Sequence, residues 1–82
     1  MSQHEIISPL PGTFYRKPTP DAPPFAEVGQ NIGAGDVIGL IEVMKQYSEL
    51  SSEVAGTVVA LLIEDGDIVE PGQVVAIIET GV

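Results

Sequence analysis

Short apolar runs with frequent interruptions dominate this chain. No long window keeps apolar residues at the i, i+3, i+4, i+7 spacing of an amphipathic helix. The runs are instead rich in β-branched residues and are separated by Gly, Pro, Asn and Asp. We expect strands at residues 5–8, 36–43, 56–63 and 73–79, and turns at residues 27–35, 64–66 and 70–72. The pattern predicts an all-β domain of several short strands, arranged as a sandwich or a barrel.

An internal repeat indicates how the strands are arranged. Residues 27–42 (EVGQNIGAGDVIGLIE) align without a gap on residues 64–79 (EDGDIVEPGQVVAIIE), at an offset of 37 residues. Each copy holds two glycine turns and then a strand, and such turns need the positive φ angles that glycine adopts easily. Further back, PGTF at residues 11–14 resembles AGTV at residues 55–58. Two similar halves of four strands each predict a flattened eight-stranded barrel with pseudo-two-fold symmetry, in which two sheets close on one core.

The two halves differ by one insertion and meet at one hairpin. The first half has seven extra residues within residues 16–25 (RKPTPDAPPF), which hold four of the seven prolines. Because proline cannot donate to a strand ladder, this segment is predicted to be a protruding loop. Residues 42–49 join the halves as a hairpin with Lys45 at its tip, and the termini are expected at the opposite end. We expect residues 1–82 to form one domain with a flexible segment over residues 1–5.

Composition excludes several classes of function. The chain has 82 residues and a formal net charge of -9, which disfavours nucleic acid or an anionic membrane as a partner. It has no cysteine and one histidine, His4, so we expect no disulfide, no metal centre and no catalytic triad. No apolar stretch is long enough to cross a bilayer, and residues 1–5 are too polar for a signal core. These features predict a cytoplasmic protein.

Lys45 is the residue best placed to carry chemistry. A hairpin tip gives a side chain high exposure and few neighbours, which suits the attachment point of a swinging arm whose cofactor performs the reaction. Tethering of this kind raises the local concentration of the arm at its partner sites to roughly millimolar. An ordinary surface lysine is the competing interpretation, since most lysines are exposed.

Three segments carry a family resemblance. They are SPLPGTFYR at residues 8–16 followed by PTPDA at residues 18–22, EVGQ at residues 27–30 followed by Gly35-Asp36, and EVMK at residues 42–45. In these segments, and over about residues 6–80, the chain resembles the biotin carboxyl carrier domains of acetyl-CoA carboxylases, within the biotinyl/lipoyl attachment family. The proline-rich "thumb" is the most specific match, because lipoyl domains and most other biotin domains lack it.

The resemblance implies a flattened barrel-sandwich hybrid that carries biotin and has no catalytic residues of its own. It implies that a biotin protein ligase attaches biotin to Lys45. A biotin carboxylase and a carboxyltransferase would then use the carrier, with acetyl-CoA as the default acceptor. The site residues that the resemblance implies are Glu42, Val43, Met44, Lys45 and Gln46 on the hairpin and Lys17, Pro18, Thr19 and Pro20 on the thumb, which would pack over the biotin ring.

Three positions depart from the family pattern. Gln46 stands where the family usually has Met, Val43 where it has Ala, and Lys17 where it has a small hydroxyl residue. A lipoyl carrier on the same fold is one alternative, but it predicts an acidic residue directly before the lysine and no thumb. An unmodified barrel that serves as a binding module is another, and Gln46 is the feature that favours it.

Overall fold

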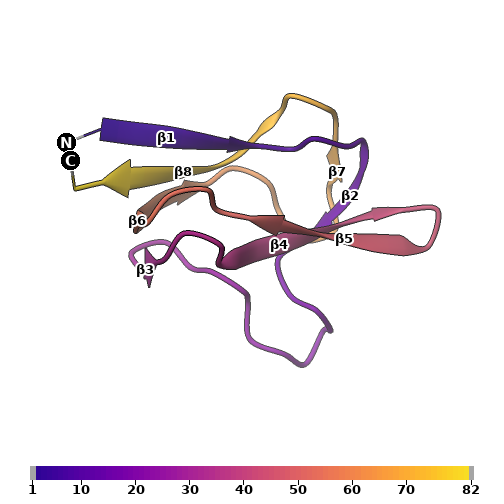
Figure 1. Ribbon diagram of the computed structural model, residues 1–82. Helices are drawn as coiled ribbons and strands as arrows, with labels where there is room; N and C mark the ends of the chain where they lie inside the picture. Colours follow the sequence, from indigo (N-terminus) through magenta and orange to yellow (C-terminus); the bar gives the residue numbers. More distant parts are fainter. Residues whose placement is uncertain (1, 82) are drawn as a thin grey trace.

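The structure is a computed structural model that describes residues 2–81. These residues form eight β-strands, joined by turns and loops, in two four-stranded antiparallel sheets (Figure 1). The first sheet has the order β1 (Ser2–Ile7), β8 (Val74–Thr80), β6 (Gly56–Leu61) and β3 (Asn31–Ile32). The second has the order β5 (Gln46–Ser51), β4 (Val37–Val43), β2 (Gly12–Tyr15) and β7 (Ile68–Val69). This arrangement confirms the predicted all-β, flattened eight-stranded fold. None of the described residues lies in a helix that could cross a bilayer.

The pseudo-two-fold symmetry is visible strand by strand. The strands β1, β8, β6 and β3 occupy the same places in their sheet as β5, β4, β2 and β7 do in the other. The symmetry extends to two buried serines, Ser8 and Ser52, each of which donates its hydroxyl to the carbonyl oxygen two residues on at 2.6 Å. Each serine carbonyl also accepts from the amide of a turn glycine at 2.8 Å, Gly72 for Ser8 and Gly35 for Ser52. The buried hydroxyls are therefore satisfied within the chain, and the serine carbonyls bond the glycine turns to the ends of β1 and β5.

The core lies between the two sheets and is built from alternate strand residues. Phe14 on β2 pairs with Ile41 on β4, and the equivalent Val58 on β6 pairs with Ile78 on β8. All four side chains are essentially inaccessible to solvent, so each contributes on the order of 2 kcal/mol of burial. Among residues 2–81, the buried apolar side chains of the core are Ile6, Phe14, Ala26, Ile32, Ile38, Ile41, Leu50, Val58, Ile63, Val69, Val75, Ala76 and Ile78.

Glycines serve two different purposes in this fold. Gly29, Gly35, Gly66 and Gly72 have φ between 85° and 93°, as the predicted turns require. Gly12 and Gly56 instead lie in strands, where a Cβ would collide with the carbonyl oxygens of Glu42 and Glu79 respectively. The absence of a Cβ at these two positions allows β2 and β6 to lie close to their antiparallel neighbours β4 and β8.

The structure differs from the sequence expectation at the first residues. The prediction of a flexible segment is wrong for residues 2–5, because they belong to β1, which pairs with β8 from Ser2↔Thr80 onward. Most side chains of this strand up to Glu5 are polar and exposed, so they give no apolar signal. Met1 lies outside the described residues. The short strands β3 and β7 also escape prediction, because two residues show no periodicity.

Candidate functional site

A two-residue turn joins β4 to β5 at the junction of the two halves. Val43 and Gln46 form the last pair of the ladder, and Met44 and Lys45 form the turn. Their φ angles are 51° and 67°, the two positive values of a type I′ turn. Neither residue is the Asn or Gly that such a turn favours, so the backbone carries a cost of about 1–2 kcal/mol for each left-handed residue.

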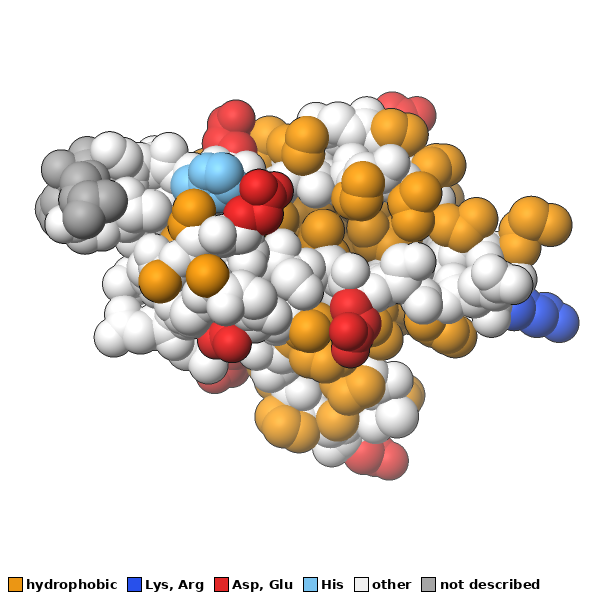
Figure 2. All heavy atoms as spheres, viewed as in Figure 1, with side chains coloured by type: hydrophobic (Ala, Val, Ile, Leu, Met, Phe, Trp, Pro, Cys, Tyr) orange, Lys and Arg blue, Asp and Glu red, His pale blue; other side chains and the backbone are white. Residues whose placement is uncertain are grey.

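The hairpin extends away from the sandwich at the end opposite the start of β1 and the end of β8 (Figure 1). Met44 is 91% exposed, and Lys45 is also exposed. In Figure 2 basic side-chain atoms mark the tip of the projecting hairpin. The geometry expected for a swinging arm is therefore present: one amine stands in solvent, distant from the body of the domain.

The outer face of the second sheet, which points away from the core, carries aromatic and acidic side chains. Glu42 pairs with Thr13 on one side and with Tyr47 on the other, so the three side chains share this face. The hydroxyl of Tyr15 donates to Glu42 Oε1 at 3.1 Å, and its ring lies 6.2 Å from that of Tyr47. This hydrogen bond to Glu42, with smaller contributions from desolvation and neighbouring charge, raises the pKa of Tyr15 above its ordinary value.

The thumb, residues 16–25, leaves the sandwich after β2 and is fixed at its base by Arg16. The backbone carbonyl of Arg16 accepts from the Phe25 amide at 2.8 Å and so closes the loop. Its Nε donates to the carbonyl of Ile63 at 2.9 Å, and its amide donates to Asp65 Oδ1 at 2.7 Å. A turn at the far end of the loop is closed by the Ala22 amide donating to the Thr19 carbonyl at 3.2 Å. Arg16 therefore positions the thumb, a role that the sequence interpretation did not assign to it.

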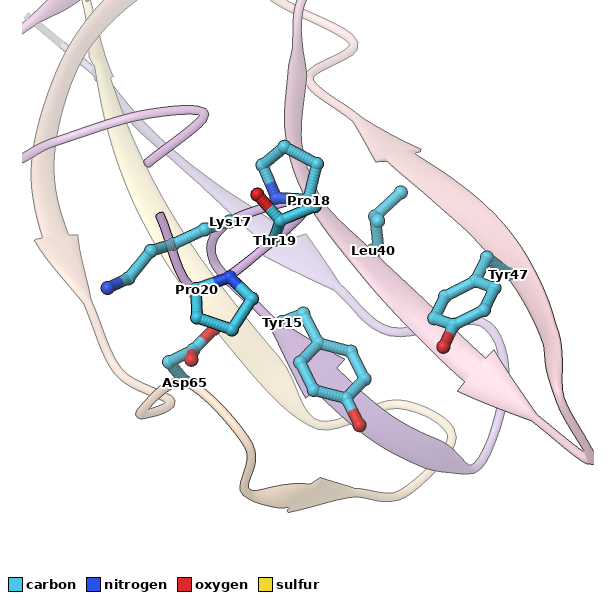
Figure 3. Close-up of a pocket in the computed structure, with 8 residues that line it drawn as sticks. All are labelled: Tyr15, Lys17, Pro18, Thr19, Pro20, Leu40, Tyr47 and Asp65. Carbon is cyan, nitrogen blue, oxygen red and sulfur yellow. The ribbon is translucent and has the colours of Figure 1, made fainter. Parts of the chain in front are cut away.

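The thumb and the outer face of the sheet enclose a hollow of about 280 Å³ (Figure 3). Its lining residues are Tyr15, Lys17, Pro18, Thr19, Pro20, Leu40, Tyr47 and Asp65. Figure 3 shows the two tyrosines on the strands and the thumb residues Pro18, Thr19 and Pro20 on the loop side. The lining combines prolines, Leu40 and aromatic rings with a few polar and charged groups, which is a composition typical of sites for small molecules.

The structure divides the residues predicted from the sequence among three places. Lys17, Pro18, Thr19 and Pro20 line the thumb hollow, and Glu42 lies on the same outer face. Val43 packs against the core side of the sheet, and its ladder partner Gln46 shares that side. Met44 and Lys45 form the tip.

Four residues of the hollow were missed: Tyr15, Leu40, Tyr47 and Asp65. The signal that could have found the first of them is strand alternation, because Tyr15 follows the apolar Phe14 and must face outward.

The hollow lies within reach of a group attached to Lys45. Leu40 is four residues from the turn, or about 14 Å at 3.4 Å per residue. A lysine side chain extended through an amide by the four-carbon chain of biotin spans roughly the same distance. The residues present therefore fit a tethered ring that folds back along the outer face beneath the thumb.

A small barrel-sandwich that presents one lysine on a projecting hairpin defines a carrier domain, whose role is to display a prosthetic group. Residues 4–78 match the family model described as "Biotin-requiring enzyme". The chain belongs to this biotinyl/lipoyl attachment family.

Two named relatives are similar to this chain. The biotin carboxyl carrier protein of acetyl-CoA carboxylase from Haemophilus influenzae is 43% identical over 79 residues, covering 96% of this chain and 51% of the relative. The chloroplastic biotin carboxyl carrier protein of acetyl-CoA carboxylase 2 from Arabidopsis thaliana is 48% identical over 61 residues, covering 74% of this chain and 24% of the relative. The chain therefore spans about half the length of the first relative and about a quarter of the second.

A solved structure shares the same fold. The urea carboxylase of Kluyveromyces lactis superposes with a TM-score of 0.79 at 33% identity, covering 96% of this chain and 6% of the enzyme. The match shows that the eight-stranded unit also occurs as a small part of a much larger protein.

Proposed function

We propose that this chain is the biotin-carrying domain of a biotin-dependent carboxylase, with biotin joined to Nζ of Lys45. The observation that carries the proposal is the exposed Lys45 directly after Met44 in a strained hairpin turn, in a chain of the biotin-requiring family. The bond formed is an amide. Nζ gives up a proton and attacks the biotin carboxyl carbon, whose oxygen leaves with an activating group derived from ATP in a biotin protein ligase.

The chain itself presents the group and performs no catalysis. When bound, biotin supplies a ureido nitrogen that accepts a carboxyl group in a biotin carboxylase and donates it in a carboxyltransferase. Lys45 contributes the flexible stem, and the rigid β4–β5 ladder holds that stem away from the body of the domain. Formation of the amide removes the positive charge of Lys45, so the hairpin then carries only the acidic Glu42 and Glu49.

The thumb hollow is proposed to hold the biotin ring when the ring is not bound in the active site of a partner enzyme. Pro18, Pro20 and Leu40 would cover its apolar faces, and Thr19 and Tyr15 would offer hydroxyl groups to its polar edge. Because the Tyr15 hydroxyl donates a hydrogen bond to Glu42, the lone pairs of its oxygen remain available to accept one. The hollow therefore supports a biotin carrier over a lipoyl carrier, for which no ring-covering thumb is expected.

The relatives supply the most specific assignment of partners. We propose a biotin carboxylase subunit and a carboxyltransferase subunit as partners, acetyl-CoA as acceptor, and the cytoplasm as the location. The support is the similarity to carrier proteins of acetyl-CoA carboxylase, together with the acidic character that disfavours nucleic acid and membranes.

The test is transfer of labelled bicarbonate to the biotinylated chain by a biotin carboxylase with ATP. We expect label on the unaltered chain and on Lys17→Arg, and none on Lys45→Arg. If the biotinylated chain accepts no label, or if Lys45→Arg accepts it, the proposal is wrong. Modification of the chain by a lipoyl ligase in place of a biotin ligase would support the lipoyl alternative.

A further inference from the structure

The hairpin has a second face, on the side opposite the thumb. The ladder pairs Val43↔Gln46 and Ile41↔Ser48 point to the side of the sheet that continues the core. Ile41 is buried, but Gln46 and Ser48 are exposed, because this part of the hairpin extends beyond the edge of the sandwich. Leu10 and Pro11, in the connection between β1 and β2, form a wall beside it. Together these residues and Met44 line a hollow of about 410 Å³.

This hollow is uncharged in a strongly acidic chain. Its lining residues are Leu10, Pro11, Val43, Met44, Gln46 and Ser48, none of which ionises. The thumb hollow, by contrast, includes Lys17 and Asp65. Figure 2 shows hydrophobic side chains gathered over the end of the molecule that carries the hairpin. The lining therefore favours a partner surface that is neutral and largely apolar over a basic one.

Met44 indicates that the surface serves a partner. Its side chain is 91% exposed, so it buries little apolar area within the chain. Its backbone is left-handed, a conformation that disfavours any residue with a Cβ. The left-handed backbone costs stability, and the exposed side chain gains little burial to offset that cost, which is typical of strain kept at a functional position.

We propose that the hollow formed by Leu10, Pro11 and the core side of the hairpin is the docking surface for the biotin protein ligase. The inference rests on the proposed function and extends it to residues distant in sequence from the attachment motif. The surface is continuous with the site of modification, because Met44 belongs to the hollow and adjoins Lys45.

Reach distinguishes the ligase from the other enzymes. An unmodified lysine side chain extends roughly 6 Å, so the enzyme that acts on its Nζ must contact the hairpin itself. The biotinylated arm is about twice as long and allows a carboxylase or carboxyltransferase to act farther from the hairpin. A hollow beside the tip therefore fits the ligase better than either carboxylation enzyme.

The proposal is tested by measuring the steady-state kinetics of biotinylation by the ligase, with the unaltered chain and the variants Leu10→Ser and Ser48→Glu as substrates. Leu10→Ser removes the apolar wall, and Ser48→Glu adds a charge at an exposed position that no core contact constrains. We expect each variant to lower kcat/KM about tenfold, mainly through KM, because truncation of a central interface residue has effects of this size. Val28→Ser is the matched control: Val28 is 61% exposed in the turn before β3, away from the hairpin, and we expect less than a twofold change.

Thermal unfolding of each variant separates docking from folding. If Leu10→Ser unfolds, Ser48→Glu decides the question. Wild-type biotinylation of Ser48→Glu and of folded Leu10→Ser contradicts the docking surface and leaves the carrier function intact. A loss confined to the carboxylation of already biotinylated variants also contradicts it, since the surface would then belong to the carboxylase. Failure of the unaltered chain to accept biotin would instead overturn the proposed function.

Discussion

Replacement of the strained turn by Met44→Asn and Lys45→Gly should stabilise the domain. Both residues have positive φ angles, 51° and 67°, in a type I′ turn that favours Asn-Gly. Each left-handed residue with an ordinary side chain destabilises the fold by about 1–2 kcal/mol. The extra conformational entropy that glycine loses on folding reduces the expected gain by about 0.5–1 kcal/mol. Met44 is 91% exposed, so its removal sacrifices little packing. We therefore expect the free energy of unfolding to rise by about 1–2 kcal/mol for the double variant.

Urea denaturation and thermal unfolding of the unbiotinylated chain measure this effect. For a domain of this size, each kcal/mol should raise Tm by roughly 4–8 °C. Gly66→Ala is the reverse control: Gly66 has φ 89° and open space where the added methyl group would lie, so the variant should lose about 1 kcal/mol through backbone strain alone. An Asn-Gly turn that leaves Tm unchanged or lowers it would refute the claim that the attachment turn is strained.

Three further outcomes follow from contacts near the site. Gly12→Ala should lower the free energy of unfolding by about 3 kcal/mol in urea denaturation, because its Cβ would collide with the carbonyl oxygen of Glu42; a loss below about 1 kcal/mol would contradict that close approach. Gly39→Ala should cost about 1–3 kcal/mol in the same assay, because its Cβ would meet the buried ring of Phe14, and a neutral result would show that the ring can move. In an ultraviolet titration, Tyr15 should ionise above the ordinary tyrosine pKa of about 10, and Glu42→Gln should lower the pKa of Tyr15. Because the pKa of Tyr15 is raised in the folded state, its hydrogen bond stabilises the domain at neutral pH. This stabilisation is lost only as the pH rises through the folded-state pKa of Tyr15.

The fold was largely predictable because it repeats. The alignment of residues 27–42 on residues 64–79 places two glycine turns and a strand in each half, and the structure confirms this equivalence in β3–β4 and β7–β8. The beginning of β1 was not predictable from apolar periodicity, because its polar residues are fixed by pairing with β8. The buried Ser8 and Ser52 repeat at the same spacing as Gly12 and Gly56, a signal that was present in the sequence.

The site was predictable only in part. The position of Lys45 followed from the junction of the two halves, since a single hairpin must join them. The thumb hollow did not follow, because Tyr15, Tyr47 and Asp65 come from three separate segments that only the folded sheet and the Arg16 contacts bring together. Likewise, the opposite placement of Glu42 and Gln46 depends on the strand register, which the sequence does not specify.

The most direct test of the account is the intact mass and peptide map of the chain after co-expression with a biotin protein ligase. The hairpin geometry predicts a single biotinyl group on Lys45, with Lys17 on the thumb unmodified. A chain that stays unmodified, or one that carries biotin on Lys17, would contradict the claim that the β4–β5 turn exists to present one amine.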